Sequence, residues 1–534
     1  MKKISIILTA ICLTAAACAQ KQVEAFTPEQ KLRASQAIIE NFYVEDVNSD
    51  TLVSEAIIAM LKTLDPHSQY STPQETKEFT EPLEGKFSGI GIQFNMLEDT
   101  VYVIQTIAGG PSEKVGILAG DRIVSANDTV IAGKKLVNTQ VMKTLRGPKG
   151  SIVNLKVKRG EELIDFTVVR DDIPLYSVDE TFMADPTTGY IRITRFAEET
   201  ANEVREAIDK LRRQGMENLI LDVSGNGGGY LGAAFELASE FLPIGTPVVS
   251  TSGRRTQPYN FVTEKKGTFL DGRLVVIADQ SSASASEILA GALQDNDRAL
   301  IVGRRTFGKG LVQRPFPFPD GSMIRLTVSR YYTPSGRCIQ RPYEKGHGDE
   351  YYLDMLNRYK SGELWSADSI ARPDSLRFET LKNHRPVYGG GGIIPDVFVP
   401  ADTSYYSTYY RDLIAKGVIN RTVINYVDAN RKSLLKTYPT GADFYKNFTM
   451  PADLLDKLIA NGTDKGVEYN EEQFNTSRPM ILAIMEGLIA RDLYEDGSYY
   501  KAIAPLSKDY NAALKLINDP TRYSNLLNGQ ERPD

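Results

Sequence analysis

A strand passes directly into a turn in the sequence Leu274-Val275-Val276-Ile277-Ala278-Asp279-Gln280-Ser281-Ser282-Ala283-Ser284-Ala285-Ser286-Glu287. A helical pattern follows from Ile288 to Leu293. A hydroxyl in such a turn lies at the amino end of the helix, where unpaired backbone N–H groups favour developing negative charge. That environment suits a nucleophile with an oxyanion hole. The pattern Ser284-x-x-Glu287 also fits a plain capping box, and the residues alone do not choose among the four serines of the turn.

A second turn, Thr306-Phe307-Gly308-Lys309-Gly310, follows the next predicted strand, Ala299 to Val302. A lysine placed between glycines and near apolar side chains can lose its water, which lowers its pKa. The neutral amine can then take a proton from a serine. The alternative interpretations are an exposed hairpin turn and a phosphate loop, although the spacing of a phosphate loop is absent.

The three histidines offer no better site. His67, His347 and His384 are scattered, and none lies in a glycine-rich or serine-rich turn after a strand. Neither a Ser-His-Asp triad nor a histidine metal centre has local support. We interpret all three as structural or surface residues.

Strands and helices alternate on both sides of these turns, from about residue 176 to residue 400. Strands are predicted at 189–193 and 218–223, and amphipathic helices at 198–214 and 232–242. This alternation predicts an α/β core. The polar segment 341–385 is predicted to be an insertion loop with a helix.

The regions outside this core show other patterns of apolar residues. Residues 27–64 read as two helices, and short alternating runs at 85–174 predict a small β-rich module. After residue 400 the pattern is helical again, at 409–430, 451–461 and 478–495.

Composition narrows the class of protein. The 534 residues include 62 basic and 68 acidic side chains, a net charge of −6, so several domains are expected. We find no basic cluster of the kind that nucleic-acid binding needs, and a nucleic-acid partner is excluded.

The amino terminus predicts export. Met1-Lys2-Lys3 precedes an apolar run from Ile4 to Leu13, and small residues follow as far as Ala19. This is the pattern of a signal peptide, 1–19, cleaved after Ala17 or after Ala19. The alternative is lipidation of Cys18, which would be the only membrane attachment. We expect a periplasmic protein in either case.

With Cys12, Cys18 and Cys338 as its only cysteines, the chain has neither a disulfide framework nor a cysteine zinc site.

Four ordered motifs resemble the carboxyl-terminal processing peptidases, also called tail-specific proteases. They are Ser282-Ala283-Ser284-Ala285-Ser286-Glu287-Ile288 with Gly291-Ala292-Leu293-Gln294-Asp295, Thr306-Phe307-Gly308-Lys309-Gly310 with Val312-Gln313, Tyr332-Thr333-Pro334-Ser335-Gly336-Arg337, and Gly392-Ile393-Ile394-Pro395-Asp396. The resemblance covers roughly residues 60 to 400 and not the helical tail.

The resemblance implies a role for each matching residue. Ser284 would be the nucleophile, Lys309 the general base and Gln313 the residue that orients the lysine. The oxyanion donors would be the N–H of Ala285 and one from Gly228 and Gly229, with Gly229 preferred. The glycine loop departs from the family pattern at Val223 and Ser224, where Leu and Arg are usual, which leaves the contacts of that arginine in doubt.

The module at 85–174 resembles a PDZ domain. Ser88-Gly89-Ile90-Gly91-Ile92 matches its carboxylate-binding loop, and the segment 111–123 matches the turn and strand that follow. The resemblance implies that Gly89, Ile90, Gly91 and Ile92 bind a peptide tail, which adds to the sheet as a strand. Arg146 matches a family position linked to gating.

The resemblance as a whole implies a crotonase-like (ClpP/crotonase-type) serine protease core with an inserted PDZ domain and helical ends. The expected regions are 26–80 helical, 85–174 PDZ, 175–400 peptidase core and 401–534 carboxyl-terminal helical domain. The expected activity is cleavage of proteins near or from their carboxyl terminus, with protein tails as partners and no metal or other cofactor. An adaptor or a homo-oligomer stays open. The rival interpretations are an inactive envelope scaffold and a hydrolase of non-peptide acyl groups.

Overall fold

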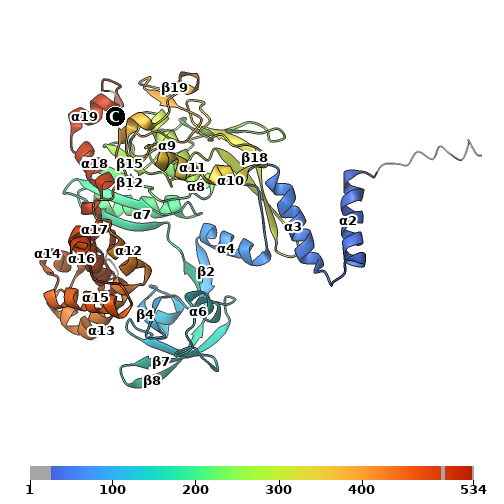
Figure 1. Ribbon diagram of the computed structural model, residues 1–534. Coiled ribbons are helices and arrows are strands. Elements are labelled where there is room, and N and C mark those ends of the chain that lie inside the picture. The colour runs from blue at the N-terminus through green and yellow to red at the C-terminus, as the bar shows by residue number, and fades with distance from the viewer. Residues whose placement is uncertain (1–25, 495–498, 532–534) are drawn as a thin grey trace, which may run out of the picture.

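The computed structural model describes residues 26–494 and 499–531. The predicted signal peptide, 1–19, and Cys18 lie outside these residues. The two predicted amino-terminal helices are confirmed as α2 (Pro28–Phe42) and α3 (Ser49–Lys62), and α2 extends away from the rest of the molecule (Figure 1). Within the described ranges, no helix has both the length and the apolar character that crossing a membrane requires.

The central sheet contains six strands in the order β10-β11-β12-β15-β16-β21, and neighbours from β11 onward are parallel. Their bounds are Val178–Met183, Thr188–Ile193, Asn218–Asp222, Leu274–Ala278, Leu300–Gly303 and Val397–Phe398. Every residue of β12, β15 and β16 is buried. Such continuous apolar runs are typical of parallel strands covered on both faces.

Helices cover both faces of this sheet. One face packs against α7 (Thr200–Arg212), α8 (Leu231–Ser239) and α9 (Ala285–Asp295). The other face packs against α18 (Lys508–Ile517) and α19 (Pro520–Leu527). Alternate side chains of the strands divide between the two cores, as the period of a strand requires. The predicted α/β core and its helices at 198–214 and 232–242 are confirmed, with ends that differ by a few residues.

A second sheet stands beside the central one. Strands β17 (Leu311–Pro317) and β18 (Met323–Tyr332) form a long hairpin. The other edge of β18 pairs with β13 (Pro247–Ser252), which pairs with β14 (Tyr259–Val262). The same edge also pairs with β1 (Gln69–Ser71), so the amino-terminal region supplies a strand to this sheet.

The region 85–174 is a small sheet with two helices. Its strands lie in the order β3-β4-β5-β7-β8, with β6 beside β5. Their bounds are β3 Ile92–Leu97, β4 Thr100–Thr106, β5 Arg122–Ala126, β6 Thr129–Val130, β7 Ile152–Arg159 and β8 Glu162–Val169, and the helices are α5 Pro111–Lys114 and α6 Asn138–Leu145. The chain enters through β2 (Lys86–Gly89) and leaves through β9 (Asp171–Pro174), which pair antiparallel. One ribbon therefore joins the module to the core.

The segment 341–385 contains more structure than the predicted loop with one helix. It contains α10 (Gly348–Tyr352), α11 (Asp354–Lys360), two 3₁₀ turns and β19 (Arg377–Glu379), which pairs with β20 (Pro386–Tyr388).

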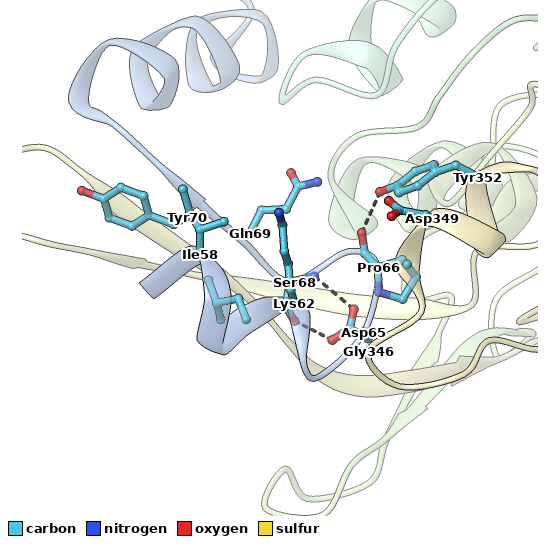
Figure 2. Close-up of a pocket in the computed structure, with 12 residues that line it drawn as sticks. Ile58, Lys62, Asp65, Pro66, Ser68, Gln69, Tyr70, Gly346, Asp349 and Tyr352 are labelled. Carbon is cyan, nitrogen blue, oxygen red and sulfur yellow. Dashed lines mark hydrogen bonds between the residues drawn. The ribbon is translucent and has the colours of Figure 1, made fainter. Parts of the chain in front are cut away.

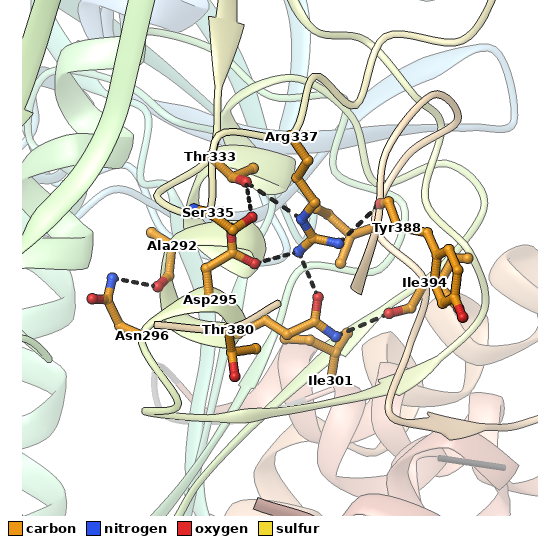
Figure 3. A network of polar contacts seen from close by, with 12 residues as sticks. Ala292, Asp295, Asn296, Ile301, Thr333, Ser335, Arg337, Thr380, Tyr388 and Ile394 are labelled. Atoms are coloured by element: carbon orange, nitrogen blue, oxygen red, sulfur yellow. Dashed lines mark hydrogen bonds and ion pairs between the residues drawn. The ribbon is translucent and has the colours of Figure 1, made fainter. Parts of the chain in front are cut away.

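A buried ion pair attaches the carboxyl end of α9 to the segment that follows β18. Arg337 donates to Asp295 at 2.6 Å, to the side chain of Thr333 and to the carbonyl of Tyr388 (Figure 3). Neither charged group of the Arg337–Asp295 pair is exposed. The motif Tyr332 to Arg337 thus anchors the helix that begins at the serine turn.

The helices after residue 400 belong to two cores. One cluster contains α12 (Thr408–Ala415), α13 (Val418–Thr437), α14 (Gly441–Asn447), α15 (Ala452–Asp464) and α16 (Glu471–Leu493). After α17 (Tyr499–Ile503), helices α18 and α19 pack on the central sheet instead. The prediction of one helix at 409–430 is wrong, because Gly417, at φ 65°, separates α12 from α13. The predicted helix at 478–495 begins earlier, at Glu471, and contains Pro479.

The first helical cluster also contacts the small β module. Ile424 of α13 packs against Leu97, Tyr102 and Ile104. Asp428 of the same helix forms a 2.7 Å ion pair with Arg122. Figure 1 shows α13 and α15 beside the part of the module that contains β4. It shows α4 (Pro73–Glu84) between the module and the central sheet.

Candidate active site

The structure distinguishes the four serines of the turn between β15 and α9. Ser282 and Ser286 are buried and donate their hydroxyls to the carbonyls of Val223 at 2.7 Å and Asn226 at 2.9 Å. Ser281 is exposed. Ser284 alone of the four lines a cavity of about 330 Å³.

Ser284 holds a strained backbone conformation at the start of α9. Its φ is 55° and its ψ is −110°, a region that residues with a side chain rarely adopt. Such a residue costs on the order of 1–3 kcal/mol and persists only when its surroundings enforce it. Here the Ser284 N–H donates to the Glu287 carboxylate at 2.9 Å, and the Ser284 carbonyl lies 3.2 Å from the Tyr331 hydroxyl.

Lys309 lines the same cavity as Ser284. Its Nζ donates to Gln313 Oε1 at 3.1 Å. Burial lowers the pKa of Lys309 and the positive charge of Arg325 lowers it further, while the Glu287 and Asp65 carboxylates act in the opposite direction. The interpretation of Gly308-Lys309-Gly310 as an exposed hairpin turn is wrong, because Gly308 and Gly310 are buried and Lys309 is partly buried. Among the described residues, no hydrogen bond joins Lys309 Nζ to Ser284 Oγ.

The cavity that contains Ser284 and Lys309 has a mostly apolar lining. The lining residues are Phe79, Thr80, Leu83, Gly227, Gly228, Gly229, Tyr230, Leu231, Ser284, Ile288, Lys309, Leu311, Val312, Gln313, Pro315, Met323, Arg325 and Tyr331. They come from α4, the glycine loop, the start of α8, the serine and lysine turns, α9 and the β17–β18 hairpin. The structure therefore brings Ser284, Lys309 and Gln313 together with the glycine loop.

Glu287 links the serine turn to the lysine turn. One carboxylate oxygen accepts from the N–H groups of Ser284 and Lys309, both at 2.9 Å. The other accepts from Thr306 Oγ1 at 2.5 Å and from the Gly308 N–H at 2.7 Å. Burial raises the pKa of Glu287, and the four hydrogen bonds that it accepts lower it. The capping box is thus present, and Glu287 also holds the two reactive turns at a fixed separation.

The candidate oxyanion donors differ in whether their N–H groups already form a hydrogen bond. The Gly228 N–H donates to the Asn226 side chain at 2.8 Å. Throughout the described part of the chain, neither the Gly229 N–H nor the Ala285 N–H has an acceptor. A side chain at Gly228, whose φ is 103°, would lie within 3.0 Å of Ala283 O, Ser284 Cβ and Ala285 N. The glycine loop can therefore press against the serine turn, and its geometry favours Gly229 over Gly228 as a donor.

Carboxylates hold the glycine loop where the family pattern has an arginine. Ser224 N donates to Asp222 at 2.7 Å, and Gly225 N donates to Asp279 at 2.9 Å. The Tyr190 hydroxyl also donates to Asp222, at 2.5 Å. These bonds fix the loop without a guanidinium at position 224.

The predicted tail-binding residues surround the start of an unpaired strand edge. Gly89 ends β2, Ile90 is buried, and Ile92 begins β3. In the described sheet β3 pairs only with β4, so its other edge carries no strand. Ile90 packs in one cluster with Val141 of α6, while the Ile90 and Gly91 carbonyls accept backbone bonds.

Arg146, at the end of α6, connects the β module to the cavity. Its Nη1 donates to Glu81 at 3.0 Å, and its guanidinium lies 4.2 Å from the centre of the Phe87 ring. Glu81 belongs to α4, the helix whose Phe79, Thr80 and Leu83 line the cavity.

Among the described residues, none of the three histidines forms a hydrogen bond with Ser284. The imidazole of His67 is buried and bonds to the Tyr351 hydroxyl at 3.0 Å, and His347 and His384 are largely exposed. In residues 26–494 and 499–531 no group of three His, Cys, Asp or Glu side chains is arranged to hold a metal ion.

Sequence reasoning missed the supporting roles of three residues. Glu287 was visible as a cap, but its bonds to the lysine turn join residues 19 to 22 positions apart. Tyr331 donates to the Lys309 carbonyl at 2.6 Å, and it lies just before the motif that begins at Tyr332. His67 accepts, through its backbone carbonyl, a hydrogen bond from Gln313 Nε2. A carbonyl leaves no signal in a sequence.

Comparisons with known families agree with the motifs. Residues 187–345 match Peptidase family S41, and residues 88–169 match the PDZ domain. Residues 11–76 match the Activating protease CtpB N-terminal domain, and residues 409–496 match a family of unknown function, DUF8443.

Two relatives and one solved structure show the extent of the similarity. The carboxy-terminal processing protease CtpB of Bacillus subtilis is 37% identical over 356 residues, 65% of this chain and 72% of the relative. CtpA of Bacillus subtilis is 33% identical over 352 residues, 64% of this chain and 75% of the relative. The photosystem II D1 C-terminal processing protease is 28% identical, with a TM-score of 0.34, over 59% of this chain and 91% of that one. The chain therefore belongs to the carboxy-terminal processing proteases, serine-type peptidases of family S41 with a crotonase-like α/β core and a PDZ domain.

Proposed function

We propose that this chain is an exported serine endopeptidase that cleaves proteins near or from their carboxyl terminus with Ser284 and Lys309. The observation that carries the proposal is the shared cavity. Ser284, Lys309 with its lowered pKa, and Gly229 all line it. The Gly229 N–H and the N–H of Ala285, the residue after Ser284, have no acceptor among the described residues. This set contains a nucleophile, a base and an oxyanion hole.

The proposed reaction begins when neutral Lys309 takes the proton of Ser284 Oγ. The oxygen attacks the peptide carbonyl, and the resulting oxyanion accepts hydrogen bonds from the Gly229 and Ala285 N–H groups. Protonated Lys309 gives its proton to the leaving amine as the peptide bond breaks, which leaves an acyl-enzyme on Ser284. Lys309, neutral again, activates the water that releases the acyl group. Gln313 supports each step by accepting a hydrogen bond from Lys309 Nζ.

The PDZ domain is proposed to bind the substrate's tail at Gly89, Ile90, Gly91 and Ile92. The free edge of β3 can accept an extended peptide as an additional strand. Backbone N–H groups of the loop would bind the terminal carboxylate. Export to the periplasm is proposed from the signal pattern at 1–19, with lipidation of Cys18 as the alternative attachment.

The decisive experiment is hydrolysis of an unfolded protein with an apolar carboxyl tail, prepared with a free and with an amidated terminus. We expect cleavage of both, with a KM about tenfold higher for the amidated protein, because it loses the charge-assisted bonds of the carboxylate. Product masses locate the cut. A serine-directed acylating probe, mapped by mass spectrometry, is expected to modify Ser284.

Other outcomes would contradict a part of the proposal or favour a rival function. Cleavage with equal KM values would contradict the proposal that the PDZ domain recognises the terminal carboxylate. Labelling at another serine would remove the nucleophile assignment. Absence of cleavage, with tail binding retained, would favour the inactive scaffold, and turnover of simple acyl esters alone would favour the non-peptide hydrolase.

Arg146→Ala is expected to weaken the coupling between tail binding and turnover, because it breaks the 3.0 Å bond to Glu81 of α4. The measurement is the turnover of a short peptide with and without an added tail peptide. We expect the ratio of the two rates to fall towards one in Arg146→Ala. Lys143→Ala, on the exposed side of the same helix, is the matched control. An unchanged ratio in Arg146→Ala would show that the ion pair does not carry the coupling.

A further inference from the structure

The orientation of the Gln313 amide is determined by a residue far away in the sequence. Gln313 Nε2 donates to the backbone carbonyl of His67, and Gln313 Oε1 accepts from Lys309 Nζ at 3.1 Å. A carbonyl can only accept, so it requires the NH₂ of the amide to face it. The amide oxygen is then turned towards Lys309. The position of the His67 carbonyl thus determines which atom of Gln313 the lysine meets.

The carbonyl belongs to a tight turn, Asp65 to Ser68, that one carboxylate organises. Asp65 accepts from the N–H groups of His67 at 2.9 Å and Ser68 at 3.0 Å, and from Ser68 Oγ at 2.6 Å. Figure 2 shows the Ser68 bonds, and it shows the Tyr352 hydroxyl donating to the carbonyl of Pro66, a bond of 2.7 Å. Asp65 and Ser68 are both buried. The turn is therefore fixed on both sides of His67.

The same carboxylate attaches the turn to the strand opposite Gln313. Thr327 pairs with Gln313 between β17 and β18. Thr327 Oγ1 donates to Asp65 at 3.0 Å, and the Thr327 N–H donates to Ser68 Oγ at 3.1 Å. Any shift of the turn relative to β18 would consequently move the His67 carbonyl away from Gln313.

The His67 ring is connected through two further side chains to the backbone next to Lys309. Its Nε2 bonds to the Tyr351 hydroxyl at 3.0 Å, which accepts from Gln340 at 3.3 Å. Gln340 Oε1 in turn accepts from the N–H of Gly310, the residue after Lys309, at 2.8 Å. Burial lowers the pKa of His67 to about 4, so the ring is neutral at neutral pH and adds no charge beside Lys309.

We propose that the turn Asp65–Ser68 positions the general base, with Asp65 as the positioning residue that acts through the His67 carbonyl and Gln313. The inference rests on the proposed Ser284–Lys309 chemistry. It gives the amino-terminal region, which also supplies β1 to the sheet of β17 and β18, an indirect part in the reaction.

The test is a double-mutant cycle of Asp65→Ala with Gln313→Ala, read as kcat and KM on a short peptide. In the wild-type background we expect Asp65→Ala to lower kcat about tenfold, the effect of one lost hydrogen bond, with KM changed less than about twofold. In the Gln313→Ala background we expect no further fall, because the amide through which Asp65 acts is absent.

Asp65→Asn is the conservative variant. It removes the same negative charge, but its amide oxygen, in the place of Oδ1, can still accept the bonds from the N–H groups of His67 and Ser68 and from Thr327 Oγ1. Only the bond from Ser68 Oγ to the second carboxylate oxygen is lost. We expect it to recover most of the lost kcat. Because both variants remove the charge that raises the pKa of Lys309, a difference between them reports the geometry of the turn.

Asp320→Ala is the matched control, because Asp320 caps an exposed turn of the β17–β18 hairpin with similar bonds to Ser322 N and Oγ. We expect it to leave kcat unchanged. If Asp65→Ala does not fold, Thr327→Val removes the hydroxyl bonded to Asp65, and a smaller fall of about threefold is expected, again absent in Gln313→Ala.

Equal falls of kcat in both backgrounds, or a wild-type kcat in Asp65→Ala, would overturn the inference. Retained activity in Ser284→Ala would instead overturn the proposed function, whatever the Asp65 variants do.

Discussion

Ser284→Ala and Lys309→Met are each expected to lower kcat/KM by about 10⁴-fold or more, because removal of one member of a catalytic unit costs nearly as much as removal of all. Alanine leaves no oxygen to attack the carbonyl. Methionine fills the volume of the lysine side chain without an amine that could take the proton. The measurement is steady-state hydrolysis of the tailed peptide, with thermal unfolding followed in parallel.

Ser281→Ala is the matched control, because Ser281 belongs to the same turn but is exposed. We expect it to keep wild-type activity. Retained activity in Ser284→Ala would identify another nucleophile, and retained activity in Lys309→Met would identify another base.

The pH profile of the wild-type enzyme follows from the same chemistry. The active form of Lys309 is neutral, so kcat/KM should rise with pH through the pKa of Lys309. Burial places that pKa below the ordinary lysine value. The rising limb should therefore lie at a lower pH than a solvent-exposed lysine would give.

Glu287→Gln is expected to lower activity about 100-fold and to destabilise the fold by about 2–6 kcal/mol, the sum for two buried donors left without acceptors. Its carboxylate accepts four hydrogen bonds, two on each oxygen. A carboxamide presents N–H groups to one of those pairs of donors. The serine turn, the lysine turn, or both must then move. Calorimetry and kcat/KM at a temperature where both proteins are folded measure the two effects.

Glu240→Gln is the control that separates an effect on stability from an effect on the active site. Glu240 is also buried and accepts four bonds, from Arg205 and Thr268, but lies outside the cavity. We expect Glu240→Gln to be destabilised while its activity at the permissive temperature stays near wild type. Wild-type activity in Glu287→Gln would mean that the two turns keep their separation without the link.

Much of the core could be predicted because its signals are local. The apolar runs of β12 and β15, and the serine and lysine turns that follow strands, are each contained within a few neighbouring residues. The family motifs then place Ser284 and Lys309 in order along the chain. The cavity joins them because parallel strands end at the same edge of the sheet.

The supports of the site could not be predicted, because they depend on contacts between distant segments. Nothing near Asp65 or Thr327 indicates that they bond to each other, and the role of His67 resides in its backbone. The helices after residue 400 illustrate the same limit. The sequence predicts a helical region at 401–534, but not that Tyr510 of α18 packs on Phe182 and Tyr190 of the central sheet rather than with α13.

The placement of α18 and α19 also determines the order in which the molecule can be made. One whole face of the central sheet has no cover until residues 508–527 have been synthesised. A nascent chain that ends at residue 400 exposes the apolar side chains of Ile220, Val275 and Leu300 to water or to chaperones. The serine turn and the lysine turn are therefore translated long before the sheet that supports them can become stable. Synthesis of residues 508–527, rather than of the motifs, sets the earliest moment at which a competent site exists.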